Sequence, residues 1–408
     1  MKFGLLGRRL GHSYSPMIFD LMGGYRHDLF EREPEGIEEL LKNGDFDGLN
    51  VTIPYKKAVI PYCHALSDTA RRLGAVNTIV RRSDGTLLGH NTDYFGFQTM
   101  VRESGLNVSG KKVLVLGSGG ASNTAVAVME DMLAVPVVIS RTGENNYENL
   151  HKHADAAVIV NCTPVGMYPN TEKSPLNIDT FPLLEGVLDV VYNPARTKLL
   201  RAAEQRGIIA MNGLLMLVAQ ARESAEWFSG VSIDNAVISE IHKQLRRQME
   251  NVILIGMPGS GKTTVGKLLA QMTGKQFVDA DLFLEKESGR AIPEIFRTDG
   301  EEAFRRLETA VLSQLGKRSG LILATGGGCV TRPENYGLLH QNGTIFCLSR
   351  DLNALPTDGR PISQTTKLEE LYRIRKPLYQ RFADHLVSNN GLPQDAAEQI
   401  LKLWEETT

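Results

Sequence analysis

Short apolar runs alternate with amphipathic segments along most of the chain. Runs rich in branched aliphatic side chains predict strands, and apolar residues three and four positions apart predict helices. Predicted strands lie at 3–7, 48–53, 112–116, 137–140, 157–161 and 187–192, and predicted helices begin at Pro16 and Ser122. This alternation of strands and helices predicts an α/β fold whose sheets are parallel and covered by helices on both faces.

The alternation of strands and helices is interrupted at residues 214–249 and then begins again. Residues 214–228 are apolar at helical spacing, and residues 233–249 form an amphipathic pattern. A new strand–helix alternation begins at Val252. The segment 242–251 is polar and contains neither Pro nor Gly, so it predicts a short helical junction and not a flexible linker. We therefore expect one region over 1–248 and a second over 249–408.

Composition narrows the class of protein. The 408 residues are enough for two or three domains, and 42% hydrophobic with 23% charged residues is typical of a globular protein. A net charge of −2 gives no argument for a nucleic-acid or membrane partner, so we expect small-molecule substrates. The four cysteines show no CxxC spacing, and the first residues lack a long apolar stretch. These features predict a cytoplasmic protein and leave its oligomeric state open.

A glycine-rich loop at 251–264, NVILIGMPGSGKTT, follows the predicted strand that opens the second region. It matches GxxxxGK[ST], in which backbone N–H groups cradle phosphates, the lysine adds a point charge and the hydroxyl of the next residue meets Mg²⁺. The loop therefore predicts binding of a nucleoside triphosphate with Mg²⁺, and Thr263 would lie at the metal. The residues predicted to bind the nucleotide, which is ATP on the resemblance given below, are Gly259, Ser260, Gly261, Lys262, Thr263 and Thr264.

Two acids follow the next predicted strand. Asp279 and Asp281 are separated by one residue, and the period of two in a strand would point both carboxylates the same way. One of these carboxylates could hold Mg²⁺ through water while the other meets a hydroxyl.

Further motifs come after these acids in a fixed order: Phe304-Arg305, the glycines at 326–328, Arg360-Pro361 and RKPLY at 375–379. Together with the loop they make residues 251–408 resemble the shikimate kinase family. The resemblance implies that the shikimate-binding residues are Asp281, Arg305, Gly327 and Arg375, and that Lys262 and Asp281 are catalytic. It also implies that Asp279 is the acid at Mg²⁺ and that Arg360 binds ATP by closing over the transferring phosphate. The segment 347–359 before Arg360 is shorter than is usual in this family, which predicts a trimmed lid.

An earlier glycine-rich loop, KKVLVLGSGGAS at 111–122, has the form of a dinucleotide-binding turn. Its third motif position is Ser122 and not glycine, so the motif alone is weak. The next predicted strand ends in Arg141, where an acid would favour NAD and an arginine accommodates the 2′-phosphate of NADP. The residues predicted to bind NADP(H) here are Gly117, Ser118, Gly119, Gly120, Ala121, Arg141 and Thr142.

Seven polar motifs surround this loop, at 11–16, 50–56, 74–78, 89–93, 161–167, 189–194 and 212–220. In this order they make residues 1–248 resemble the shikimate dehydrogenase family. The resemblance implies NADPH-dependent reduction of 3-dehydroshikimate, with Lys56 and Asp93 as catalytic residues that also touch substrate and Gly213 in the NADP site. The other substrate-binding residues would be Ser13, Ser15, Thr52, Asn77, Tyr192 and Gln220. It also implies a substrate domain of 1–95 plus 213–248 around an NADP domain of 96–212.

One departure from that family keeps alternatives open. Residues 141–161 are shorter than usual by about one helix–strand unit, which predicts a compact cofactor domain and fewer contacts to the adenine side. The alternatives are a quinate/shikimate dehydrogenase that uses NAD, or a degenerate domain that only supports the kinase. Because Lys56 and Asp93 are both retained, we predict a bifunctional enzyme, with Rossmann-like and P-loop domains.

Overall fold

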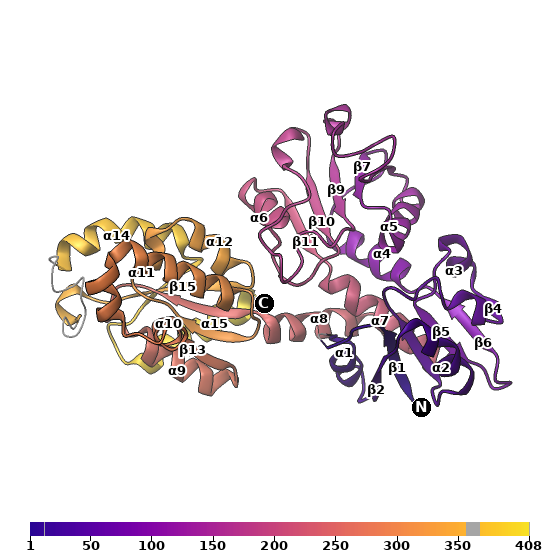
Figure 1. Ribbon diagram of the computed structural model, residues 1–408, viewed down its shortest axis with the longest axis horizontal. Helices are drawn as coiled ribbons and strands as arrows, with labels where there is room; N and C mark the ends of the chain where they lie inside the picture. The colour runs from indigo at the N-terminus through magenta and orange to yellow at the C-terminus, as the bar shows by residue number, and fades with distance from the viewer. Residues whose placement is uncertain (12, 356–367, 408) are drawn as a thin grey trace. The chain divides into compact units, whose positions relative to one another are not determined.

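The computed structural model describes residues 1–11, 13–355 and 368–407 and divides into two compact units (Figure 1). The first unit holds Met1–Tyr192 and Leu199–Gln244, and the second holds Asn193–Lys198 and the chain from Leu245 onward. The chain passes from the first unit to the second within helix α8 (Ala236–Met249), which contains most of the predicted helical junction.

The first unit opens with a six-stranded sheet in the order β2-β1-β3-β5-β6-β4. Its strands are β1 (Phe3–Gly7), β2 (His27–Glu31), β3 (Gly48–Val51), β4 (Ala65–Leu66), β5 (Thr78–Arg81) and β6 (Leu87–His90). The prediction of a parallel sheet is wrong here, because β5 runs antiparallel to both β3 and β6. The connection between β5 and β6 is a tight turn, too short for the crossover that parallel strands require.

Helices α1 (Ser15–Leu21), α2 (Ile37–Asn43), α3 (Asp68–Leu73), α4 (Asp93–Glu103) and α7 (Leu214–Ser229) accompany this sheet, with short 3₁₀ turns η1 (Pro34–Gly36) and η2 (Ile60–Tyr62). Although α7 is far along the sequence, it packs against β3, β5, α1 and α4. Glycine allows the close approach of α4 and α7, since a Cβ on Gly96 would lie 2.6 Å from the Met216 carbonyl oxygen. These contacts carry the α7 side chains to the carboxyl ends of β1 and β3.

The second sheet of this unit is fully parallel, in the order β11-β10-β9-β7-β8. Its strands are β7 (Lys112–Leu116), β8 (Val135–Ile139), β9 (Val158–Asn161), β10 (Gly186–Asp189) and β11 (Ile209–Asn212), with helices α5 (Gly120–Asp131) and α6 (Lys198–Gln205) and the turn η4 (Ile178–Thr180). Between β8 and β9 the only helical element is the 3₁₀ turn η3 (Leu150–His153), and β8 ends the sheet. The short 141–161 segment therefore holds no α-helix before β9.

The second unit contains a parallel sheet in the order β13-β14-β12-β15-β16. Its strands are β12 (Asn251–Ile255), β13 (Gln276–Asp279), β14 (Leu321–Ala324), β15 (Gly343–Ser349) and β16 (His385–Ser388). The helices are α9 (Lys262–Thr273), α10 (Ala280–Ser288), α11 (Ile292–Gly316), α12 (Glu334–His340), α14 (Leu368–Phe382) and α15 (Pro393–Thr407), with 3₁₀ turns η5 (Cys329–Thr331) and η6 (Leu352–Ala354). Apolar clusters cover both faces of this sheet, so its central strands are buried.

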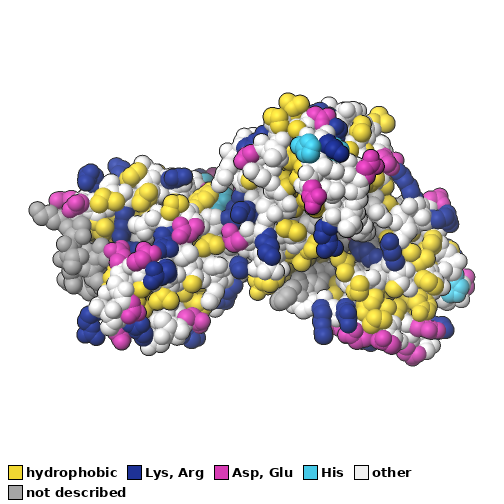
Figure 2. Space-filling model, turned by 45° about the horizontal axis from the view of Figure 1, so that its top comes forward, with side chains coloured by type: hydrophobic (Ala, Val, Ile, Leu, Met, Phe, Trp, Pro, Cys, Tyr) yellow, Lys and Arg dark blue, Asp and Glu magenta, His cyan; other side chains and the backbone are white. Residues whose placement is uncertain are grey.

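The surface is mixed in charge. Figure 2 shows acidic and basic side chains interspersed among uncharged ones on the visible face, in keeping with the net charge of −2. Among the described helices, none has both the length and the apolar character needed to cross a bilayer.

Candidate active sites

A cavity of about 460 Å³ lies in the first unit, at the carboxyl ends of β1 and β3. All eight side chains predicted to bind the dehydrogenase substrate line it: Ser13, Ser15, Thr52, Lys56, Asn77, Asp93, Tyr192 and Gln220. They come from loops and helix starts far apart in sequence, which the mixed sheet and α7 bring together. Arg9 lines the same cavity and was not predicted from the sequence.

Lys56 and Asp93 form an ion pair in this cavity. The Lys56 Nζ lies 2.5 Å from Asp93 Oδ2, and the two side chains are 26% and 12% exposed. The Asn77 side-chain amide donates to the other oxygen, Asp93 Oδ1, at 2.9 Å. Since both carboxylate oxygens are held, the carboxylate is fixed while the ammonium remains open to a ligand in the cavity.

A buried network of hydroxyl and amide groups holds Asn77, which in turn holds Asp93. The Ser224 hydroxyl lies 3.0 Å from those of Thr78 and Thr92 and accepts a 2.9 Å hydrogen bond from the Asn50 amide. Thr92 in turn donates its backbone N–H to Asn77 Oδ1 at 2.7 Å. The sequence did not single out Ser224, because only the docking of α7 shows which of its side chains meet β3 and β5.

The loop after β7 has the geometry of a dinucleotide cradle. Gly117 has φ of 108°, a value that favours glycine, and its N–H donates to the Ile139 carbonyl at 2.8 Å. A Cβ added to Gly119 or Gly120 would meet no protein atom within 4 Å, so the space over the loop is open. Helix α5 starts at Gly120 and has no acid in its first turn, which leaves its positive end free for phosphate. The loop therefore fits the pyrophosphate of NADP(H).

Arg141 and Thr142 follow β8, which pairs with β7, so they lie beside the glycine loop, and both are exposed. Gly213 has a packing role, because a Cβ there would lie 2.1 Å from the Val190 carbonyl oxygen. Among the residues predicted to bind NADP(H), Ala121 and Gly213 line the substrate cavity, whereas Gly117, Ser118, Gly119, Gly120, Arg141 and Thr142 do not. This division suits a cofactor whose reactive end enters the cavity while its phosphates stay outside.

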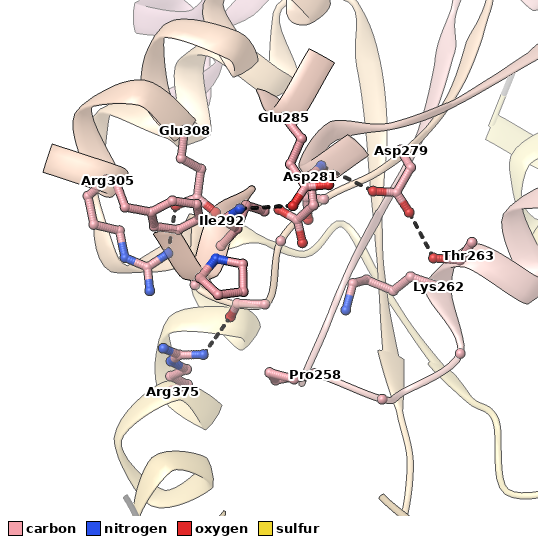
Figure 3. Close-up of a pocket in the computed structure, with 18 of the residues that line it drawn as sticks. Pro258, Lys262, Thr263, Asp279, Asp281, Glu285, Ile292, Arg305, Glu308 and Arg375 are labelled. Carbon is pink, nitrogen blue, oxygen red and sulfur yellow. Dashed lines mark hydrogen bonds and ion pairs between the residues drawn. The ribbon is translucent and has the colours of Figure 1, made fainter. Parts of the chain in front are cut away.

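A cavity of about 670 Å³ lies in the second unit, above the glycine loop that follows β12 (Figure 3). The predicted residues that line it are Gly259, Gly261, Lys262, Thr263, Thr264, Asp279, Asp281, Arg305, Gly327 and Arg375. Ser260 does not line it; this residue is buried, and its carbonyl accepts a hydrogen bond from the Asn389 amide at 2.7 Å. Arg360 lies outside the described residues, so the predicted lid contact stays a prediction.

The phosphate loop is closed on itself and on the next strand. Lys262 Nζ donates to the carbonyls of Gly256 and Met257 at 2.9 and 3.0 Å. The Thr263 hydroxyl donates to Asp279 Oδ2 at 2.9 Å, which places two hard oxygen ligands together and fits Mg²⁺.

The prediction that Asp279 and Asp281 lie on one strand is wrong. Asp279 ends β13, but Asp281 lies in the first turn of α10. Asp279 Oδ1 accepts the Asp281 N–H at 3.1 Å and thereby caps the helix. The two carboxylates still line one cavity, because the chain turns from strand to helix between them.

Asp281 lies in a buried cluster of charges. Its pKa is raised to about 6, first by burial and then by the nearby carboxylates of Glu308 and Asp279. Glu308 accepts a hydrogen bond from Arg305 Nη1 at 2.7 Å, and burial raises its pKa. Glu308 was not predicted as a site residue. Its position three residues after Arg305 on α11 would have indicated that the two side chains are neighbours. Its Oε1 has no hydrogen-bond partner among the described residues and is free to meet a ligand hydroxyl.

The close approach of this charged cluster to the backbone explains why glycines follow β14. A Cβ on Gly326 would lie 2.6 Å from Glu308 Oε1, and a Cβ on Gly328 would lie 2.1 Å from the Arg305 guanidinium. The Gly327 carbonyl accepts hydrogen bonds from Arg375 Nη1, at 3.1 Å, and from the Tyr379 hydroxyl. Figure 3 shows Arg305 and Arg375 at one end of the cavity and Lys262 with Thr263 at the other.

Both regions match known families. Residues 5–79 match the family described as shikimate dehydrogenase substrate binding domain, and residues 258–405 match the family described as shikimate kinase.

Individual relatives match a larger share of the chain. The shikimate dehydrogenase (NADP(+)) of Clostridium perfringens (strain 13 / Type A) is 35% identical over 266 residues, which cover 60% of this chain and 98% of that protein. The protein of the same name from Symbiobacterium thermophilum is 37% identical over 261 residues, covering 56% of this chain and 88% of that protein.

Solved structures agree. A chorismate mutase/shikimate 5-dehydrogenase fusion protein from Clostridium acetobutylicum superposes with a TM-score of 0.57 at 36% identity, covering 60% of this chain and 96% of that one. Shikimate 5-dehydrogenase from Thermus thermophilus, in complex with NADP(H) and shikimate, gives 0.55 at 29% identity, with 60% and 99% covered.

Proposed function

The chain belongs to the shikimate dehydrogenase family and continues into a shikimate kinase domain, and we propose that it catalyses two consecutive reactions. It reduces 3-dehydroshikimate to shikimate with NADPH, and it phosphorylates shikimate to shikimate 3-phosphate with ATP. It is thus a bifunctional enzyme of the shikimate pathway. Residues 1–95 with 213–248 form the substrate domain, 96–212 the NADP domain and 249–408 the kinase domain, and the packing of α7 on the first sheet supports this division.

Lys56 and Asp93 serve the reduction. The C3 carbonyl becomes an alkoxide as hydride arrives, and this oxygen needs a proton and a nearby positive charge. The Lys56 ammonium, 2.5 Å from Asp93, can supply both. The remaining hydroxyl and amide groups of the cavity, on Ser13, Ser15, Thr52, Asn77, Tyr192 and Gln220, hold the ring hydroxyls and carboxylate.

The glycine loop and Arg141 hold the cofactor. NADPH supplies the hydride when it is bound. Residues 117–121 receive its pyrophosphate at the start of α5, and Arg141 with Thr142 receives the 2′-phosphate. Gly213 lines the cavity that the reactive end of the cofactor would enter, and its lack of a side chain lets this backbone pack against Val190.

The second cavity serves phosphoryl transfer, in which positioning and charge neutralisation supply most of the rate. Arg305 and Arg375 clamp the shikimate carboxylate, and Gly327 lets the ring approach the backbone. Asp281 orients the attacking hydroxyl and accepts its proton. Lys262 and the loop amides neutralise the phosphates, while Thr263 and Asp279 hold the Mg²⁺ that accompanies ATP.

One observation carries the proposal: in each unit the residues predicted to bind substrate and the residues predicted to react line a single cavity, among those that the structure describes. The test supplies the full chain with 3-dehydroshikimate, NADPH and Mg·ATP and measures shikimate 3-phosphate. We expect product at the expense of NADPH. Lys56→Ala should lower the dehydrogenase rate by roughly 10²- to 10⁴-fold and leave phosphorylation of added shikimate intact.

The same assay separates the alternatives. A degenerate first domain would phosphorylate added shikimate but would not oxidise NADPH with 3-dehydroshikimate. A quinate/shikimate dehydrogenase would prefer NAD⁺ and oxidise quinate in the reverse direction.

A further inference from the structure

The dehydrogenase cavity contains one positive charge that the proposed reaction does not use. Its charged lining side chains, among the described residues, are Arg9, Lys56 and Asp93. Lys56 and Asp93 neutralise each other at 2.5 Å. Arg9 is exposed and makes no ion pair within the described part of the chain. The cavity is therefore positive before a ligand enters, and Arg9 is the source of that charge.

Arg9 lines the cavity, whereas its neighbour Arg8 does not. Arg8 pairs with Glu33 at 2.9 Å and does not line the cavity. The chain then makes a turn, closed by the Ser13 N–H on the Leu10 carbonyl at 2.9 Å. Arg9 and Ser13 lie on either side of this turn and both line the cavity. Ser13 Oγ also accepts the Ser15 N–H at 3.2 Å.

The substrate has a charge that needs such a partner. On the proposed function, which this inference rests on, 3-dehydroshikimate places its carbonyl at Lys56, and its carboxylate is on another ring carbon. The hydroxyls of Ser13 and Ser15 can donate hydrogen bonds to a carboxylate, but they are neutral and leave its negative charge uncompensated. A guanidinium can balance the charge and donate two parallel hydrogen bonds.

We infer that Arg9 recognises the carboxylate of the dehydrogenase substrate and thereby selects anionic substrates. The guanidinium acts with the hydroxyls of Ser13 and Ser15 on the same loop. It binds the substrate equally in the ground state and the transition state, because the carboxylate takes no part in the hydride transfer.

The experiment compares Arg9→Gln with Arg8→Gln in the full chain. Arg9→Gln should raise KM for 3-dehydroshikimate by roughly tenfold, with kcat and KM for NADPH nearly unchanged. Arg8→Gln should change none of these constants. Arg9→Lys should give an intermediate KM, because it keeps the charge and loses the paired hydrogen bonds. Added salt should raise KM of the wild-type chain more than that of Arg9→Gln.

Three outcomes decide the matter. An unchanged KM for 3-dehydroshikimate in Arg9→Gln overturns the inference. A rise in KM for NADPH alone also overturns it, because Arg9 would then serve the cofactor phosphates. Wild-type chain that fails to oxidise NADPH with 3-dehydroshikimate refutes the proposed function itself, independently of Arg9. An unchanged kcat and an unchanged KM for NADPH show that the first unit of each variant is folded, and kinase activity reports the same for the second unit.

Discussion

At the scale of single residues, the sites depend on charges whose partners differ in kind. Lys56 and Arg305 are paired with carboxylates from the same unit, at 2.5 and 2.7 Å. Arg9 and Arg141 are exposed; Arg9 lines the dehydrogenase cavity, and Arg141 lies shortly after the end of β8. Lys56 and Arg305 are therefore held in position for the reaction, whereas Arg9 and Arg141 are the better targets for changing the affinity for substrate and cofactor.

Arg141 should decide between the two nicotinamide cofactors. Replacing it with Asp removes the partner of the 2′-phosphate and adds a repulsive charge at the end of β8. We expect KM for NADPH to rise by roughly tenfold or more, the size of a lost charge-assisted hydrogen bond, with little change for NADH. Steady-state kinetics with both cofactors provides the measurement. An equal response to both would show that Arg141 is not the 2′-phosphate contact.

His27 should make the first unit sensitive to acid. Its ring stacks on Phe19 with centroids 4.1 Å apart, its Nε2 lies 3.2 Å from Asn50 Oδ1, and burial lowers its pKa to about 4. Between pH 6.5 and 4 the unfolded chain binds a proton here and the folded chain does not. Stability is therefore lost as the pH falls through this window, by at most about 3 kcal/mol.

His27→Phe keeps a stacking ring and removes the titrating group. The urea midpoint of the first unit, followed by circular dichroism and by dehydrogenase activity, should fall less between about pH 7 and about pH 5 in this variant than in the wild-type chain. A fall of the same size in both would remove His27 as the cause.

At the scale of elements, chemistry collects where strands end and helices begin. Gly117 leads from β7 to α5, the phosphate loop leads from β12 to α9, and Asp279 leads from β13 to α10. Helix starts present unpaired N–H groups, which suits phosphates and acidic caps. The loop after β14 is different, because its glycines make room for the side chains of other elements.

Gly328 offers the sharpest test of this loop. An added Cβ would lie 2.1 to 2.3 Å from the Arg305 guanidinium, which must then move. Gly328→Ala should lower kcat/KM for shikimate in the kinase reaction by roughly tenfold or more, mainly through KM. Dehydrogenase activity of the same chain is the internal control. Normal kinase constants would mean that Arg305 does not need its present position.

At the scale of the whole molecule, the two activities should be coupled only through free shikimate. The net charge is −2, so long-range attraction cannot hold an anionic intermediate near the protein. Unlabelled shikimate, added while labelled 3-dehydroshikimate is converted, should dilute the label in shikimate 3-phosphate to the extent set by the bulk pool. Product that stays fully labelled, with no lag, would establish channelling.

The sequence alone determined the local motifs. Both glycine loops, Arg141, and the polar loops containing Lys56 and Asp93 were predicted, since backbone conformation and spacing within a few residues encode them. The compact 141–161 connection followed from its length. Only the tertiary structure decided contacts between distant segments: the antiparallel β5, the Ser224 network, Glu308 beside Asp281, and Arg9 on the cavity wall while Arg8 pairs elsewhere. Each of these contacts depends on how helices and strands pack against one another. That packing involves many residues far apart in the sequence, so no short sequence pattern predicts it.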